Sequence, residues 1–244
     1  MKVYISPSMQ QYNKYAAGDT TEAEQCHRIG EYAAAAMRRC GIAVKLADAE
    51  QTAEQNVAES NAWGADYHIC IHTNAANGQA RDVVVFTSLK NSEDACARAV
   101  YEAIDVLDGH KSIYGVRTAN YYEIKATSAK CIYVECEFHD NAELAEWIIA
   151  NVGKLGEAIA KGMCVGSGIE YIEPIKDIFS DIDGSAHREA IEWLYEQGIT
   201  KGYKDGTFRP NQPITRGEMA TMLSRMYDAI KKEQAVKIGG KEVT

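Results

Sequence analysis

Short apolar runs alternate with amphipathic helical segments over the first two thirds of the chain. The runs at 3–5, 42–46 and 67–72 are typical of buried strands, and a helical pattern separates each run from the next. Strands that alternate with helices in this way pack as a sheet with helices on its faces. The pattern therefore predicts an α/β fold with a mixed, mostly parallel sheet flanked by helices.

The pattern continues to residue 163 and then changes. Further strands are expected at 82–86 and 131–138, and further helices at 92–106 and 142–163. A segment containing Gly and Pro follows, and it has no regular period. We therefore divide the chain into an α/β domain at 1–165, a linker at 166–178, a small helical domain at 179–231 and a loosely ordered tail at 232–244.

Charge and composition exclude several classes of protein. Lys and Arg number 26 against 35 Asp and Glu, which gives a net charge of −9 and argues against nucleic-acid binding. No apolar stretch approaches the roughly 20 residues of a membrane helix, and the N-terminus lacks the features of a signal peptide. The seven cysteines include no CxxC pair. These features predict an acidic protein made in the cytoplasm with its thiols reduced.

Four segments of the first domain carry residues suited to metal chemistry. They are Ile5-Ser-Pro-Ser-Met9, the helix start at Glu24, Ile71-His-Thr-Asn-Ala75 and Tyr133-Val-Glu-Cys-Glu-Phe-His-Asp-Asn141. In order and spacing these segments resemble the zinc-dependent N-acetylmuramoyl-L-alanine amidases of the type-3 family, over residues 1–165. The resemblance implies hydrolysis of the amide between the lactyl group of N-acetylmuramic acid and L-alanine in peptidoglycan, with Zn²⁺ as cofactor.

The resemblance also implies roles for individual residues. Glu24 and His72 correspond to zinc ligands, and Glu135 corresponds to the catalytic carboxylate. Where the family has its first histidine ligand, this chain has Met9, and a thioether is a poor zinc ligand. We predict that His139 replaces it after a turn in the chain. His27 is the alternative, because it lies one helical turn after Glu24.

Some of these residues also have structural explanations. Glu24 follows Thr21 at the spacing of a capping box, and His27 borders the apolar stripe of its helix. Glu135 is harder to explain in this way, because an unpaired carboxylate inside an apolar strand costs several kcal/mol. A nearby metal ion or a raised pKa would remove that objection.

Two polar residues are predicted to contact the substrate. The resemblance assigns this role to Asn74, which follows the strand of His72, and to Lys125, in the segment before the last strand. A solvated surface charge is the alternative interpretation of Lys125.

The C-terminal domain contains a long turn motif. Phe179-Ser-Asp-Ile182, the run Gly202-Tyr-Lys-Asp-Gly-Thr-Phe-Arg-Pro-Asn211 and Ile214-Thr-Arg-Gly-Glu218 together resemble the S-layer-homology module of cell-wall-anchored proteins. The resemblance implies binding to an anionic wall polymer or to peptidoglycan, and Arg209 and Arg216 are the predicted contacts. The motif occurs once, so either several chains assemble or one copy binds weakly.

The sequence thus favours a zinc amidase that acts at the bacterial cell wall. A wall anchor without a signal peptide is typical of a phage or prophage endolysin. The main alternative is an inactive amidase fold that only binds the wall, which Met9 favours. A different zinc peptidase acting on the same wall is a further alternative.

Overall fold

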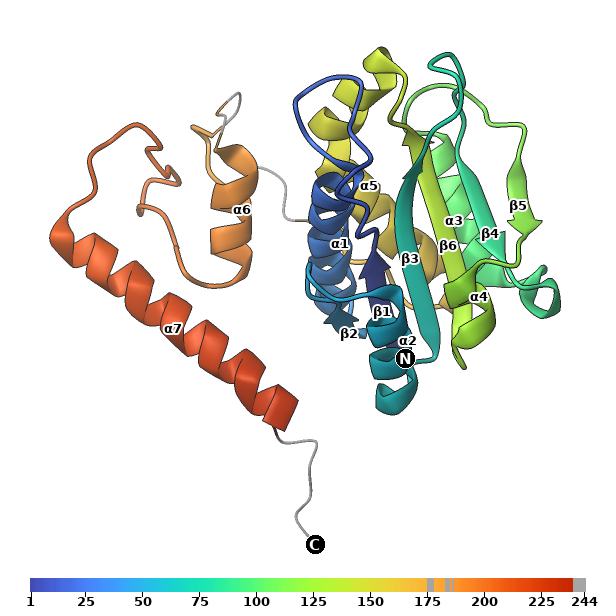
Figure 1. The fold of residues 1–244 in the computed structure, drawn as a ribbon. Helices are drawn as coiled ribbons and strands as arrows, with labels where there is room; N and C mark the ends of the chain where they lie inside the picture. The colour runs from blue at the N-terminus through green and yellow to red at the C-terminus, as the bar shows by residue number, and fades with distance from the viewer. Residues whose placement is uncertain (175–177, 183–184, 186, 239–244) are drawn as a thin grey trace, which may run out of the picture. The chain divides into compact units, whose positions relative to one another are not determined.

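The computed structural model describes residues 1–174, 178–182, 185 and 187–238. The chain divides into two compact units, Met1–Glu173 and Pro174–Thr244 (Figure 1). The last helix of the first unit, α5 (Ala142–Ser167), extends past the expected domain end at residue 165. Residues 175–177 of the expected linker lie outside the described residues.

The first unit is built on a six-stranded sheet with the order β2-β1-β3-β6-β4-β5. Strands β4 and β6 pair antiparallel, whereas the other neighbouring strands run parallel. The predicted mixed, mostly parallel sheet is therefore confirmed. The six strands, in chain order, are β1 (Lys2–Pro7), β2 (Ala43–Leu46), β3 (Tyr67–Asn74), β4 (Val84–Thr87), β5 (Gly115–Thr118) and β6 (Lys130–Phe138).

Helices cover both faces of this sheet (Figure 1). The main hydrophobic core lies between one face and the helices α1 (Glu22–Arg39), α3 (Ala95–Asp105) and α5. The shorter helices α2 (Ala53–Trp63) and α4 (Tyr122–Ala126) lie on the opposite face. A 3₁₀ turn (Leu89–Asn91) precedes α3. The second face is therefore the less completely covered one, and it carries the polar residues described below.

Helix α5 approaches its two neighbours closely at glycines. A Cβ added at Gly162 would lie 2.4 Å from the Cα of Val100 on α3. A Cβ added at Gly156 would lie 2.7 Å from the backbone nitrogen of Ala33 on α1. Both contacts involve backbone atoms, which cannot rotate away as a side chain can. The core of the first unit therefore depends on glycine at these positions.

We expect Gly162→Ala to lower the free energy of unfolding by about 1–3 kcal/mol or more, because the added methyl group forces α3 and α5 apart. Gly153→Ala on the same helix is the matched control, since its Cβ would meet only the Tyr32 ring, at 3.7 Å. The control is expected to gain up to about 1 kcal/mol in helix propensity. Urea unfolding of both variants tests this, and equal stabilities would contradict it.

The second unit has a small core of its own beneath a turn-rich loop. Phe179, Ile182 and Ile191 are buried together, and Phe208 packs against them. Two helices complete the unit, α6 (Arg188–Glu196) and α7 (Arg216–Ile238). Thr215 and Glu218 exchange side-chain and backbone hydrogen bonds at the start of α7, which is a capping box.

Helix α7 continues to Ile238, so the tail expected from residue 232 is helical up to that point. Residues 239–244 of that tail lie outside the described residues. Of the helices that the structure describes, none combines the length and apolar character that a membrane span requires.

Candidate metal centre

Polar side chains line the second face of the sheet, toward the carboxyl ends of β3 and β6. Alternation along β3 turns Ile69 and Ile71 into the main core, which leaves His72 on the opposite face. Glu135 is the residue paired with His72 in the parallel β3–β6 register. The sheet therefore brings His72 and Glu135 together although they are far apart in the sequence.

Glu22 is the carboxylate that contacts His72. Glu22 is the first residue of α1 after the N-cap Thr21, and it is 1% exposed. Its Oε1 lies 2.8 Å from His72 Nδ1, and its Oε2 accepts a 2.7 Å hydrogen bond from Asn13 Nδ2. Burial raises the pKa of Glu22, but the hydrogen bond and charge of His72 and the bond from Asn13 outweigh it and bring that pKa below its ordinary value.

A loop after β1 completes this group of side chains. Gln10 Nε2 lies 3.4 Å from His72 Nδ1, and Gln10 Oε1 accepts a 2.8 Å hydrogen bond from Asn13. The ring of Tyr133 stacks on the His72 ring with a centroid distance of 4.4 Å. We refer to Gln10, Asn13, Glu22 and His72 as the Glu22–His72 cluster.

Glu135 faces this cluster with one carboxylate oxygen that has no partner. Its Oε2 is buried and has no hydrogen-bond partner among the described residues. Burial is the main cause that raises the pKa of Glu135 from 4.5 to about 7, with the nearby Glu22 adding to the effect and His72 opposing it. A carboxylate with a pKa near neutrality can both accept and donate a proton at physiological pH.

The raised pKa of Glu135 predicts a pH-dependent stability. Because the folded state binds this proton more tightly than the unfolded state, the stabilisation is complete below about pH 4.5 and is lost as the pH rises through about 7. At 1.36 kcal/mol for each pKa unit, the charged form of Glu135 lowers the free energy of unfolding by about 3 kcal/mol.

In the presence of a metal chelator, Glu135→Gln is therefore expected to be more stable than wild type at pH 8 and about equal to it at pH 5. Urea unfolding at the two pH values measures the difference. A variant that gains the same stability at both values would contradict a raised pKa in the folded protein.

Glu24, the ligand predicted from the sequence, does not point into the cluster. It is exposed, and its carboxylate accepts a 2.7 Å hydrogen bond from Thr20 Oγ1. The structure brings Glu22 to His72 in its place. The physical reason is the helical period: Glu22 is four and seven residues from Cys26 and Ile29 of the buried stripe, whereas Glu24 lies on another face.

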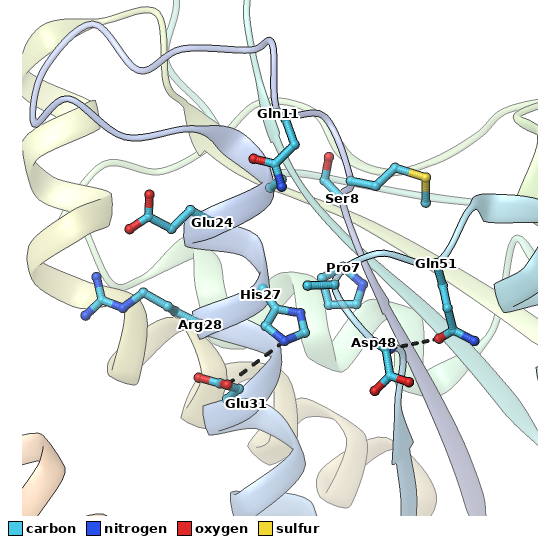
Figure 2. A pocket seen from close by; sticks show the side chains of 12 residues that line it. Pro7, Ser8, Gln11, Glu24, His27, Arg28, Glu31, Asp48 and Gln51 are labelled. Atoms are coloured by element: carbon cyan, nitrogen blue, oxygen red, sulfur yellow. Dashed lines mark hydrogen bonds and ion pairs between the residues drawn. The ribbon is translucent and has the colours of Figure 1, made fainter.

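His27 also lies away from His72. Its Nε2 is 4.0 Å from Glu31 on the next turn of α1. Figure 2 shows Glu24, His27 and Glu31 around a pocket of about 350 Å³, with Asp48 across from His27. Met9 lines the same pocket. The alternative ligand His27 therefore belongs to the outer side of α1.

His139 is buried and is held by groups other than the cluster. Its Nδ1 lies 2.9 Å from Thr73 Oγ1 and 3.0 Å from the Thr73 carbonyl, and its ring stacks on Tyr15 at 5.1 Å. A hydrogen bond from its backbone nitrogen to the Asn74 carbonyl fixes it beside the end of β3. These contacts hold His139 beside the end of the sheet, and His72 is not among them.

The two predicted substrate contacts lie at the surface of the first unit, on separate elements. Asn74 is partly exposed, and its Oδ1 accepts a hydrogen bond from the backbone nitrogen of Ala75. Lys125 is exposed on α4. Among the hydrogen bonds of the described residues, none joins Asn74 or Lys125 to His72 or Glu135.

A second group of possible ligands lies deeper on the same face. Among the residues that the structure describes, His68, Cys70 and Glu123 are the group whose ligand atoms lie within 4.8 Å of one another. His68 Nε2 is 2.9 Å from Glu123 Oε2, which also accepts a 2.6 Å hydrogen bond from Ser6. All three are buried, so a metal ion there would have no open position for a substrate. Burial and the neighbouring Cys131 also raise the pKa of the Cys70 thiol, which opposes its use as a thiolate ligand.

The two predicted wall contacts differ in their surroundings. Arg209 is held within its own loop, because its guanidinium donates to Asp205 Oδ2 at 2.7 Å and lies over the Tyr203 ring at 4.2 Å. Arg216 is exposed and lines a hollow of about 300 Å³ together with apolar residues of α7. Arg209 is therefore held in the loop by its own neighbours, and both arginines are exposed.

The fold and the cluster together define an α/β protein with a candidate metal centre at the carboxyl edge of its sheet. Residues 3–165, more than half of the chain, match the model of the N-acetylmuramoyl-L-alanine amidase family. The chain belongs to that family. Residues 178–220 match the S-layer homology domain.

Individual relatives are similar to parts of this chain. The chain is 32% identical over 85 residues to cell surface glycoprotein 1 of Acetivibrio thermocellus, covering 34% of this chain and 4% of the relative. It is 25% identical over 126 residues to the N-acetylmuramoyl-L-alanine amidase CwlM of Bacillus licheniformis, covering 50% of this chain and 47% of the relative. This chain therefore spans less than half of either protein.

A solved structure shares the fold of the first unit. The catalytic domain of the amidase CwlV from Bacillus (Paenibacillus) polymyxa superposes with a TM-score of 0.61 at 14% identity, covering 70% of this chain and all of that domain. At this level of identity the likeness concerns the fold.

The donor set of the Glu22–His72 cluster fits the zinc ion that the family implies. Zinc binds imidazole nitrogen and carboxylate oxygen. His72 Nδ1 and Glu22 Oε1 are one atom of each kind, and they lie 2.8 Å from each other. The partnerless oxygen of Glu135 also fits, because a cation nearby would compensate its buried charge. The cluster therefore supplies two ligands of the kinds that zinc prefers.

Several residues of the cluster were not expected from the sequence. Gln10 and Asn13 have no distinctive spacing, so no sequence signal could have found them, and the same holds for Tyr133, which stacks on His72 beside the cluster. Glu22 did have a signal, because it continues the buried stripe of α1 by one turn toward the N-terminus.

Proposed function

We propose that the chain is a zinc-dependent N-acetylmuramoyl-L-alanine amidase that hydrolyses the amide between the lactyl group of N-acetylmuramic acid and L-alanine of peptidoglycan. The observation that carries this proposal is the arrangement of Glu135, a buried carboxylate with a raised pKa and a partnerless oxygen, on the strand next to the Glu22–His72 pair. Family membership supports the proposal, because this reaction is the one named by the family.

Glu22 and His72 would hold the metal ion. When bound, zinc polarises the scissile carbonyl and makes a water molecule acidic enough to react at neutral pH. Asn13 keeps the Glu22 carboxylate oriented through its 2.7 Å hydrogen bond, and the stacked Tyr133 ring restricts rotation of His72. These contacts prepare the pair for binding before any ligand arrives.

Glu135 would move the protons of the reaction. In its ionised form it accepts a proton from the attacking water, and in its protonated form it donates that proton to the amine as the carbon–nitrogen bond breaks. A pKa of about 7 allows both forms to be populated near neutral pH. The products are a free carboxyl on the lactyl group and a peptide with a free N-terminal alanine.

The second unit would hold the enzyme on the bacterial cell wall. Its match to the S-layer homology domain and the exposed Arg216 support binding to an anionic wall polymer or to peptidoglycan. A guanidinium group recognises carboxylates by paired hydrogen bonds. A single module of this kind gains avidity when several chains assemble, so we include a homo-oligomer on the wall in the proposal.

The direct test is to incubate the full chain and Zn²⁺ with purified peptidoglycan. Mass spectrometry of the released peptides should find new free N-terminal alanine, and the same samples should show the protein sedimenting with the wall material. Cleavage at any other bond would contradict the proposed specificity.

The second candidate function is a wall-binding protein with an inactive amidase fold. Met9 favours it, because the family's first histidine ligand is missing at that position. Sedimentation with walls and no peptide release, in the presence of Zn²⁺, would support this candidate in place of the amidase.

A further inference from the structure

The loop between β1 and α1 places the side chain of Gln10 near His72. Met9 lines the outer pocket beside α1. The next residue, Gln10, approaches His72. The backbone nitrogen of Ser8 donates a 2.8 Å hydrogen bond to the Ile71 carbonyl, which holds the loop against β3 one residue before His72.

The Gln10 carboxamide lies beside the ring nitrogen of His72 that also contacts Glu22. Gln10 Nε2 is 3.4 Å from His72 Nδ1, and Glu22 Oε1 is 2.8 Å from the same nitrogen. The atom of Gln10 in contact with His72 is the amide nitrogen, and the oxygen of the same carboxamide is the atom that can bind a cation. The contact therefore places the Gln10 carboxamide next to the two side chains that would hold the metal ion.

Asn13 holds the carboxamide oxygen of Gln10 near the carboxylate of Glu22. One nitrogen, Asn13 Nδ2, donates to Gln10 Oε1 at 2.8 Å and to Glu22 Oε2 at 2.7 Å. An amide oxygen has two lone pairs, so Gln10 Oε1 can accept from Asn13 and still use the other toward a cation. Hydrogen bonds of this kind commonly orient the residues that bind a metal.

The two histidines considered from the sequence are engaged elsewhere. His139 Nδ1 is within 3.0 Å of the Thr73 carbonyl, and His27 lies beside Glu31 on the outer side of α1. Gln10 is the residue of the β1–α1 loop that contacts His72 directly. Both histidines are therefore held by contacts other than His72.

We propose that Gln10 is the third side-chain ligand of the metal centre, through Oε1, in place of the histidine of the family. This inference rests on the proposed zinc dependence. A neutral amide oxygen is a weaker zinc ligand than imidazole, so the centre would bind zinc less tightly than one with two histidines and a carboxylate.

The test compares zinc affinity in four proteins by competition with a chromophoric chelator. We expect Gln10→Ala to weaken zinc binding about 10- to 100-fold. Gln10→His should strengthen it. Gln11→Ala is the matched control, because Gln11 is the neighbouring exposed glutamine and lines the outer pocket. It should bind zinc as the wild type does.

Cobalt(II) provides a second measurement that does not depend on activity. The visible absorption of the Co²⁺ protein reports the ligand atoms, so Gln10→His should shift the spectrum while Gln11→Ala leaves it unchanged. Near-ultraviolet circular dichroism establishes that the variants are folded.

The outcomes separate this inference from the proposed function. If the wild type binds zinc, His72→Ala does not, and Gln10→Ala binds as tightly as wild type, then Gln10 is not a ligand although the metal centre stands. If the wild type binds no zinc, both the inference and the zinc-dependent function are overturned.

Discussion

Glu135→Gln is expected to reduce the release of stem peptides from peptidoglycan about 10²- to 10⁴-fold, the usual contribution of a general acid–base group. Gln has nearly the shape of Glu but cannot accept or donate a proton in this role. Because Glu135 faces the cluster and holds no metal in our proposal, the zinc content of the variant should stay near that of the wild type. Timed digestion with mass spectrometry of free N-terminal alanine measures the rate.

Glu137→Gln is a useful control for this experiment. Glu137 lies two residues further on the same strand, and its carboxylate accepts a hydrogen bond from the backbone nitrogen of Asp82 at 3.0 Å. The control should not share the large loss of rate if Glu135 is the proton carrier, and a comparable loss in both variants would sink that assignment.

Glu22→Gln and Glu24→Gln are expected to differ sharply, although the residues are two positions apart. Glu22→Gln removes the negative charge 2.8 Å from His72 Nδ1, so we expect at least about 100-fold weaker zinc binding and a matching loss of activity. Glu24→Gln changes an exposed carboxylate that accepts a hydrogen bond from Thr20. Zinc affinity and activity should therefore stay within about twofold of the wild type.

Zinc titration and peptide release, measured on both variants, decide between the two glutamates. Circular dichroism excludes a general loss of structure, which matters because Glu22 is buried. Loss of zinc in Glu24→Gln with normal binding in Glu22→Gln would reverse the assignment and restore the ligand predicted from the sequence.

The order of strands and helices could be predicted because each long element repeats its hydrophobic pattern over several residues. The main strands and the helices α1, α3 and α5 have this property, and their burial follows from it. Strand β5 and helix α4 could not be found, because β5 has a single apolar side chain, Val116, and α4 is little longer than one helical turn. Their pairing with β4 and packing on α2 are tertiary effects.

The candidate site could be predicted less completely than the fold. His72 and Glu135 were recognisable through the family resemblance, and their position on strands whose carboxyl ends meet at one edge agrees with it. The choice between Glu22 and Glu24 depended on helix phase. The proposed third ligand, Gln10, depends on the path of an irregular loop, and no periodicity describes such a loop.

The residues of the Glu22–His72 cluster come from the β1–α1 loop, the start of α1 and the end of β3, which lie up to 62 positions apart in the chain. Such donors are scattered in the unfolded polypeptide and converge only when the sheet has formed. A cation that binds them is therefore also a folding ligand, and at 100 times its dissociation constant it adds about 2.7 kcal/mol to the stability of the first unit. Availability of the metal in the surroundings would thus set both the resistance of this unit to unfolding and its lifetime against proteases at the wall.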